Sequence, residues 1–213
     1  MLREKYELMG SIVNENDIKI LLLNHEIFSG IFSRYGPPPD WKRPEGFTTL
    51  SRIILEQQVS LESARSHFNK LNNYLPSFTP KEILKLSDAE MRTCQISKQK
   101  STYLRALSTS VINKKINLDT LIELNPDIIR QKLKEIKGIG NWTADIYMIF
   151  CLQTKDIFPI GDVAVNTTIK ELCNLQIREE IDQLIESWKP FRSLAAFFLW
   201  HFYLSKRKRN VIY

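Results

Sequence analysis

The segment from Leu133 to Asp162 constrains the fold of this chain more than any other stretch. It reads LKEIKGIGNWTADIYMIFCLQTKDIFPIGD: a helical segment, a Gly-Ile-Gly turn, a second helical segment and a proline loop that ends in a carboxylate. We expect Gly138 and Gly140 both to allow positive φ and, lacking Cβ atoms, to let N–H groups of the following helix approach a phosphate. Because many helix pairs reverse direction at glycines, the surrounding residues must decide what this turn does.

The spacing of apolar residues predicts an all-α fold. Apolar side chains recur at intervals of three and four residues, and glycine occurs only 7 times in 213 residues. One predicted helix, opened by Ser60, buries the stripe Leu61, Ala64, Phe68, Leu71 and Leu75. Capping boxes and helix-opening prolines mark further helix starts at Thr79-Pro80-Lys81-Glu82, Ser87-Asp88-Ala89-Glu90 and Asn125-Pro126.

The N-terminal part of the chain predicts one helix that begins at Asp17. Gly36 and the three prolines after it should end this helix. The side chains expected to point inward are Ile18, Leu21, Leu22, Phe28, Ile31 and Phe32.

The charge balance favours a polyanionic partner. There are 30 Lys and Arg against 24 Asp and Glu, a net charge of +6, and four of the positive charges lie together at Lys206–Arg209. The run Lys206–Arg209 fits a direct phosphate contact as well as it fits the alternative of a solvated tail or a nuclear-import signal.

The cysteines predict neither a disulfide framework nor a metal site. Cys94, Cys151 and Cys173 lie far apart and form no CxxC pair, so we expect reduced core residues. The N-terminal residues lack the apolar core of a signal peptide, and no run approaches the ~20 apolar residues of a membrane span. We therefore expect an intracellular protein, in the cytoplasm and nucleoid, or in the nucleus of a eukaryote, with no membrane partner.

Three motifs in one order resemble the helix-hairpin-helix (HhH-GPD) superfamily of DNA base-excision glycosylases. The first is Ile53–Ser60 (IILEQQVS), the second is the Gly138-Ile139-Gly140 hairpin with Asp162, and the third is Trp188–Trp200 (WKPFRSLAAFFLW). The first and third are similar to the 3-methyladenine DNA glycosylase II branch, which excises alkylated bases. The resemblance covers roughly residues 40–205.

This resemblance implies an architecture of two helical lobes that flank a DNA-binding cleft. One lobe would span residues 46–154 and end in the helix-hairpin-helix, with the hairpin at about 133–145. The other would combine residues 1–45 with 155–213 and carry the catalytic aspartate. The cysteine spacing excludes the four-cysteine iron–sulfur cluster of some relatives, so no cofactor is expected.

Asp162 is the candidate catalytic residue. It precedes a predicted helix over Val163–Leu172, where it could cap the helix and where the helix dipole favours an anion. Cleavage of an N-glycosidic bond builds positive charge on the sugar, and paired carboxylates usually assist it. One carboxylate suffices when the departing base is already cationic, as 3-methyladenine and 7-methylguanine are, so the resemblance implies excision of alkylated bases.

Aromatic residues near this carboxylate are candidates for the base pocket. Trp142 stands where relatives that also cut the strand carry a Schiff-base lysine, which implies a monofunctional glycosylase. Trp200 matches the family's pocket tryptophan, although its apolar neighbours would equally suit a core residue. Tyr147 and Ile146 are further pocket candidates.

The expected partner is double-stranded DNA with damaged bases, bound by a monomer. Gln58 stands where a relative inserts a wedge, and it could fill the gap left by a flipped nucleotide. The other predicted DNA-binding residues are Gln57, Ser60, Lys137, Gly138, Ile139, Gly140, Thr143 and Arg192, the last of which could instead brace the lobe of Asp162. By resemblance, the carbonyls of Lys134, Ile136 and Ile139 could hold a monovalent cation that takes no part in catalysis.

Three alternatives compete with this interpretation. The same fold could act on oxidised, deaminated or mismatched bases, because the pocket wall decides the substrate. The chain could also be a non-catalytic module that binds damaged DNA. An all-α interaction protein without a nucleic-acid partner is the third alternative, which the first motif and the hairpin argue against.

Overall fold

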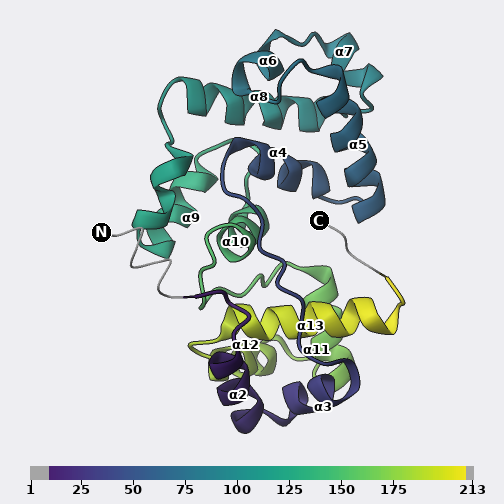
Figure 1. Ribbon diagram of the computed structural model, residues 1–213, viewed down its shortest axis with the longest axis vertical. Coiled ribbons are helices and arrows are strands. Elements are labelled where there is room, and N and C mark those ends of the chain that lie inside the picture. Colours follow the sequence, from purple (N-terminus) through teal and green to yellow (C-terminus); the bar gives the residue numbers. More distant parts are fainter. Residues whose placement is uncertain (1–9, 210–213) are drawn as a thin grey trace. The chain divides into compact units, whose positions relative to one another are not determined.

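The computed structural model describes residues 10–209, and this part of the chain is entirely helical apart from its loops and turns. No strand occurs between residues 10 and 209, which confirms the all-α prediction (Figure 1). No helix in the same range is long and apolar enough to cross a membrane.

The chain divides into two compact units. The first, here called the hairpin unit, is Arg43–Tyr147. The second, here called the terminal unit, combines the described residues up to Lys42 with those from Met148 onward. The boundary at Tyr147 and Met148 falls inside one helix, so a continuous backbone helix joins the two units.

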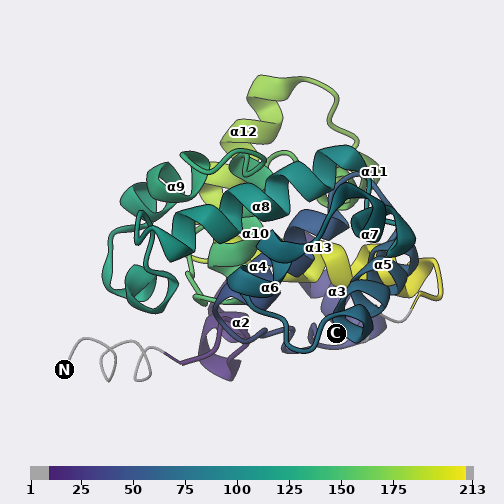
Figure 2. The ribbon, with the colours of Figure 1, turned by 90° about the horizontal axis from the view of Figure 1, so that it is seen from above.

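The hairpin unit is built around α8, which packs against α4, α6 and α7 (Figures 1 and 2). Its elements are α4 (Phe47–Glu56), α5 (Leu61–Tyr74), α6 (Pro80–Lys85), α7 (Asp88–Thr93), α8 (Lys98–Ile112), the 3-10 helix η1 (Leu118–Glu123), α9 (Pro126–Lys134) and the first part of α10 (Asn141–Phe150).

Side-chain caps set the helix starts that the sequence predicts. Ser60, Thr79 and Asn125 each accept a hydrogen bond from a backbone N–H in the first turn of the following helix. At Ser87 the capping box is complete, because Glu90 also accepts a bond from the Ser87 N–H, whereas Thr79 shows only the first half of a box. Leu61 departs from its prediction: it is the first residue of α5 and is 44% exposed.

The terminal unit packs around α13, whose buried face contacts α2, α3 and α11 (Figure 1). Its elements are α2 (Glu15–Asn24), α3 (Glu26–Tyr35), α11 (Val163–Cys173), α12 (Arg178–Ser187), α13 (Arg192–Lys206) and the last part of α10. Phe28 of α3 is fully buried and places its ring 5.2 Å from that of Trp188 and 5.6 Å from that of Phe198.

The single N-terminal helix predicted from Asp17 is wrong, because the chain forms two helices there. The first begins at Glu15 with Asn14 as its cap, and His25 then takes an extended conformation that separates α2 from α3. Apolar residues seven apart, such as Leu21 and Phe28, fit one straight helix or two, so periodicity could not reveal the break. Gly36, with φ of +76°, ends α3 as expected.

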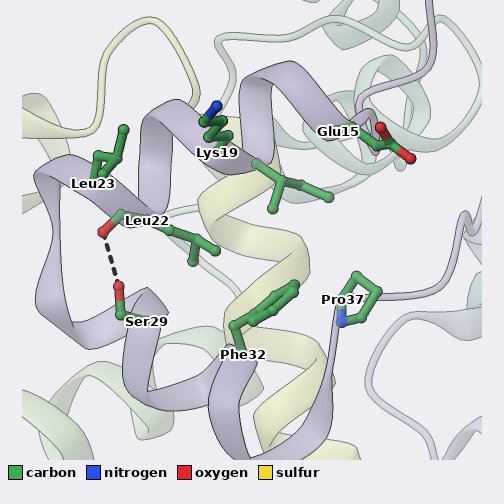
Figure 3. A pocket seen from close by; sticks show the side chains of 8 residues that line it. Glu15, Lys19, Leu22, Leu23, Ser29, Phe32 and Pro37 are labelled. Carbon is green, nitrogen blue, oxygen red and sulfur yellow. Dashed lines mark hydrogen bonds between the residues drawn. The ribbon is translucent and has the colours of Figure 1, made fainter.

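Side chains of α2 and α3, together with Pro37, line a groove. Phe32, predicted to point inward, is 37% exposed, and Leu22 is half-buried. The groove has a volume of about 560 Å³ and is lined by Glu15, Ile18, Lys19, Leu22, Leu23, Ser29, Phe32 and Pro37 (Figure 3). The Ser29 hydroxyl donates to the Leu22 carbonyl at 2.8 Å and ties α3 to the end of α2 (Figure 3).

The capping box of α7 should make stability depend on pH. Bonds from the Ser87 hydroxyl and N–H, and from the Tyr74 hydroxyl, lower the pKa of Glu90 below 4.5. The stabilisation is therefore complete above pH 4.5 and is lost as the pH falls below it. In urea unfolding, Glu90→Gln should be less stable than wild type at neutral pH, and the difference should shrink on acidification. A difference that is independent of pH would contradict this role of Glu90.

Candidate functional site

Asp162 is held in a fixed orientation at the start of α11. It is the N-cap residue of that helix, as predicted, and its Oδ1 accepts a hydrogen bond from the Val165 N–H at 3.0 Å. The backbone before it forms a tight turn in which the Asp162 N–H donates to the Pro159 carbonyl at 2.8 Å. The side chain is half-buried, so the protein fixes the carboxylate without enclosing it.

Trp200 also donates a hydrogen bond to this carboxylate. Its indole N–H donates to Asp162 Oδ1 at 3.0 Å from α13. The ring is 8% exposed and packs against Phe150 and Phe197, with centroids 5.1 Å and 6.0 Å away. Most of the Trp200 ring therefore belongs to the core, while its N–H reaches the candidate catalytic group; its role in a base pocket stays a prediction.

A buried serine, which the sequence did not single out, holds the loop before Asp162. Ser193 is fully buried. Its Oγ lies 2.6 Å from the Thr154 carbonyl oxygen, and the same Oγ accepts a hydrogen bond from the Ile157 N–H at 3.0 Å. The Ser193 N–H donates to the Lys155 carbonyl at 3.1 Å. These bonds tie the first turn of α13 to the chain that leads to the carboxylate. Only the position of Ser193 within the third motif could have indicated this role.

Arg192 braces the same loop. Its Nε donates to Asp156 Oδ1 at 2.7 Å, a second nitrogen donates to Asp156 Oδ2 at 3.0 Å, and its remaining terminal nitrogen pairs with Glu186 at 2.7 Å. A guanidinium that is shared by two carboxylates holds a loop more firmly than a single surface pair does. The structure thus contains the bracing arrangement that the sequence offered as one of two roles for Arg192.

In the hairpin unit, α9 and α10 are joined by a turn in which only Gly138 needs to be glycine. Gly138 has φ of +97°, and a Cβ atom there would lie 2.1 Å from Cγ of Tyr103. Gly140 does not have positive φ, and a Cβ atom there would meet nothing within 4 Å. The expectation that both glycines take positive φ is therefore wrong for Gly140, whose missing Cβ leaves open space beside the start of α10.

Gln57 ties the loop after α4 to the hairpin. Its side-chain amide donates to the Gly138 carbonyl and to Thr143 Oγ1, both at 2.8 Å. Thr143 is buried, at 2% exposure, so its hydroxyl serves this internal bond. Gln57 and Thr143 were both predicted to bind DNA, and the structure places their side chains in contact with each other inside the unit.

Gln58 lies next to this clamp and is exposed. Its φ of +56° is unusual for a residue with a side chain. The exposed Ser60 follows and caps α5 by accepting a bond from the Ser63 N–H at 3.1 Å. The loop therefore directs Gln57 toward the hairpin and leaves Gln58 exposed.

A partly buried ion pair joins the two helices of the hairpin. Arg130 of α9 donates to Asp145 Oδ1 of α10 through Nε at 3.0 Å and through a terminal nitrogen at 2.8 Å. Burial raises the pKa of Asp145, while Arg130 and Lys134 oppose the rise. The sequence predicted no role for either residue, because an ion pair between residues 15 positions apart on two helices leaves no local sequence pattern.

The remaining predicted residues differ in their exposure. Trp142 is half-buried in the first turn of α10, whereas Ile146 and Tyr147 are buried, and the Tyr147 hydroxyl accepts a bond from the Gly46 N–H at 2.9 Å. Lys137 is exposed on the turn.

Of the carbonyls suggested for a monovalent cation, that of Ile136 accepts a hydrogen bond from the Ile139 N–H at 3.0 Å. Between residues 10 and 209 no three His, Cys, Asp or Glu side chains gather as metal ligands would.

The sequence matches the family model of the HhH-GPD superfamily of base excision DNA repair proteins over residues 51–190. This range contains the Gln57-Gln58 loop, the hairpin and Asp162, which confirms the resemblance found in the sequence. The chain is 30% identical to the alkylbase DNA glycosidase-like protein mag2 of Schizosaccharomyces pombe, over 81% of this chain and 86% of that protein. It is 27% identical to DNA-3-methyladenine glycosylase 1 of the same yeast, over 93% and 91% of the two chains.

Solved structures agree with this assignment of the fold. The 3-methyladenine DNA glycosylase of S. pombe, determined in complex with abasic DNA, superposes with a TM-score of 0.73 at 26% identity, covering 83% of this chain and 89% of that one. A DNA-3-methyladenine glycosidase from Bacillus halodurans has the same fold, with a TM-score of 0.77 at 23% identity over 93% and 94% of the two chains.

The two glycines of the hairpin should respond differently to a methyl group. Gly138→Ala should lower the free energy of unfolding by about 1–3 kcal/mol, because it strains the backbone and collides with the Tyr103 ring. Gly140→Ala, the matched control, should change it by no more than about 0.5 kcal/mol. Urea unfolding of both variants measures the difference. Equal losses would mean that the turn does not have the geometry described.

Proposed function

The chain belongs to the HhH-GPD superfamily of base excision DNA repair proteins, and on this premise we propose that it is a monofunctional DNA glycosylase for alkylated bases. Its substrates would be cationic purines such as 3-methyladenine and 7-methylguanine in double-stranded DNA. The observation that carries the proposal is the Asp162 carboxylate, which accepts hydrogen bonds from the Val165 N–H and the Trp200 indole. Asp162 also follows the hairpin in the sequence, as the family's motif order requires. The S. pombe relatives, named as an alkylbase DNA glycosidase-like protein and a DNA-3-methyladenine glycosylase, support the substrate class.

The proposed reaction is hydrolysis of the N-glycosidic bond. The electron pair of that bond leaves with the base and neutralises the positive charge that alkylation placed on it. Positive charge then develops at C1′ of the deoxyribose, where Asp162 would stabilise it. A water oxygen bonds to C1′, and its proton passes to Asp162 and on to solvent, which leaves an abasic site. A neutral base would need a proton before it could leave, whereas a cationic base does not.

The two hydrogen bonds to Oδ1 support a role for Asp162 in the transition state. A charged group stabilises a transition state best when it is already oriented, because no reorganisation is then needed during the reaction. The Val165 N–H belongs to the first turn of α11, and the Trp200 N–H is fixed by a ring packed in the core. Neither donor can move without disturbing a helix, so the carboxylate keeps its orientation when the substrate arrives.

The hairpin unit would hold the DNA. The first N–H groups of a helix have no partner within that helix and attract phosphate oxygens. At the start of α10, the open space beside Gly140 would let a phosphate approach the backbone, and Lys137 would add positive charge. We propose that Gln58 fills the gap left by the flipped nucleotide, since its exposed amide could hydrogen-bond the unpaired opposite base.

The tryptophan at position 142 supports both the substrate class and the absence of strand cleavage. An indole has no amine and cannot form the Schiff base through which lysine-bearing relatives would cut the strand. Its ring is half-buried, and a cationic base stacked on it would gain about 0.5–2 kcal/mol. We further propose that the enzyme acts as a monomer, inside the cell, without an iron–sulfur cluster or other cofactor.

The reaction products test the proposal. The protein is incubated with methylated duplex DNA and, separately, with duplexes that contain hypoxanthine or 8-oxoguanine. Free 3-methyladenine and 7-methylguanine should be released without strand cleavage, and borohydride should trap no protein–DNA adduct. A trapped imine would contradict monofunctional action, and release from only the other two duplexes would contradict the substrate class.

Loss of the charge at position 162 tests the mechanism. Asp162→Asn keeps the size of the side chain but cannot stabilise a sugar cation, so the single-turnover excision rate should fall by about 100-fold or more. Binding to duplex DNA and the unfolding transition should change little, which band-shift and urea experiments would show. Activity near that of the wild type would remove Asp162 from the mechanism. Asp182→Asn, which neutralises an exposed carboxylate on α12, is the control and should leave the excision rate unchanged.

A further inference from the structure

The first turns of α8 contact the hairpin turn and the end of α4 that leads into the Gln57-Gln58 loop, next to the two segments that the proposed function assigns to DNA. Lys100, in the first turn, extends its ammonium to the Leu55 carbonyl at 2.5 Å. Leu55 lies in the last turn of α4, where carbonyls have no partner within the helix and where a cation is favoured. The contact therefore fixes the end of α4 immediately before Gln57 and Gln58.

Tyr103, one turn further along α8, lies against the hairpin. Its ring occupies the space that a side chain at position 138 would need, because a Cβ atom there would lie 2.1 Å from Tyr103 Cγ. Its hydroxyl accepts a bond from the Gln99 amide at 2.7 Å, which fixes the ring. Residues three apart on a helix share a face, so Lys100 and Tyr103 support the two loops from one side of α8.

Gln57 closes the connection between the two loops. Its amide joins the loop after α4 to the Gly138 carbonyl and to Thr143, as described above. The end of α4, the hairpin turn and the first turns of α8 thus form a closed set of contacts, all within the hairpin unit. A displacement of either loop must break a hydrogen bond or move the Tyr103 ring.

We propose that Lys100 and Tyr103 are positioning residues, which keep the Gln57-Gln58 loop and the Gly138 turn in one fixed relation during base excision. This inference rests on the proposed function. The hairpin would hold the phosphates while Gln58 enters the duplex, so an error in the distance between the two loops would misplace the flipped nucleotide. Misplacement by about 1 Å can cost roughly a hundredfold in rate. Neither residue touches the reacting atoms.

The chemistry of Lys100 favours this role over simple packing. The side chain is half-buried, and burial lowers its pKa. Placing a cation in such a position costs solvation energy that an apolar side chain would avoid. A lysine here is useful chiefly because it reaches a carbonyl at the end of α4 that no apolar residue could bind.

The first experiment measures the connection without any activity. Amide hydrogen exchange is followed in the free protein at residues 57–60 and 136–140, for Lys100→Met and for Tyr103→Ala. Each variant should speed exchange in both segments, including the one that the altered residue does not contact. Thr102→Ala, on another face of α8, is the control and should leave both unchanged. Faster exchange confined to the contacted segment would overturn the proposal.

The second experiment measures catalysis. In single-turnover excision of methylated duplex DNA, Lys100→Met should lower the rate by about tenfold or more, with little change in affinity for undamaged duplex. Lys100→Arg should keep much of the wild-type rate because it retains a cationic donor, and Tyr103→Phe, which keeps the ring but not the hydroxyl, should be faster than Tyr103→Ala. A proportional loss of rate and affinity, or no rescue, would overturn the positioning role. If the wild type releases no base, the proposed function fails, whereas hydrogen exchange still tests the connection.

Discussion

The hydrogen bond from the Trp200 indole to Asp162 is the interaction on which the proposed chemistry most depends. Together with the Val165 N–H, it orients a carboxylate that would otherwise rotate at the start of a helix. Trp200 can act in this way because its ring is anchored in the core of the terminal unit by Phe150 and Phe197. The buried Ser193 and the Arg192–Asp156 pair fix the preceding loop from the same helix, α13. A single apolar helix thus determines where the charge is held.

The hairpin unit reaches its geometry by different means. Its turn needs a glycine only at Gly138, where positive φ and the Tyr103 ring exclude any side chain. The Gln57 amide then links the turn to the loop after α4, and the Arg130–Asp145 pair joins the two helices of the hairpin. These contacts use side chains from α8, α9 and α10 and from the loop after α4, so we expect the loops that would meet DNA to be rigid although they lie outside regular structure. Rigid loops lose less conformational entropy on binding than mobile ones do.

Much of this structure could be predicted from the sequence, and the failures have physical reasons. The predicted helix starts at Ser60, Ser87 and Asn125 are correct because a cap is a local interaction between residues that lie within four positions of each other. The break at His25 was missed because both helices keep one apolar period across it. Gly140 was misjudged because positive φ depends on the whole turn rather than on residue type. The contacts of Ser193, Arg192 and Trp200 join distant segments, and only the fold brings these together.

The most direct test of the account is whether Asp162 recognises positive charge at the sugar position. Duplexes that carry either a cationic pyrrolidine or a neutral tetrahydrofuran in place of the damaged nucleoside differ mainly in that charge. The wild-type protein should bind the pyrrolidine duplex about tenfold or more tightly than the tetrahydrofuran duplex, and Asp162→Asn should bind the two alike. A preference for pyrrolidine that survives in Asp162→Asn, or that is absent from the wild type, would contradict the central claim.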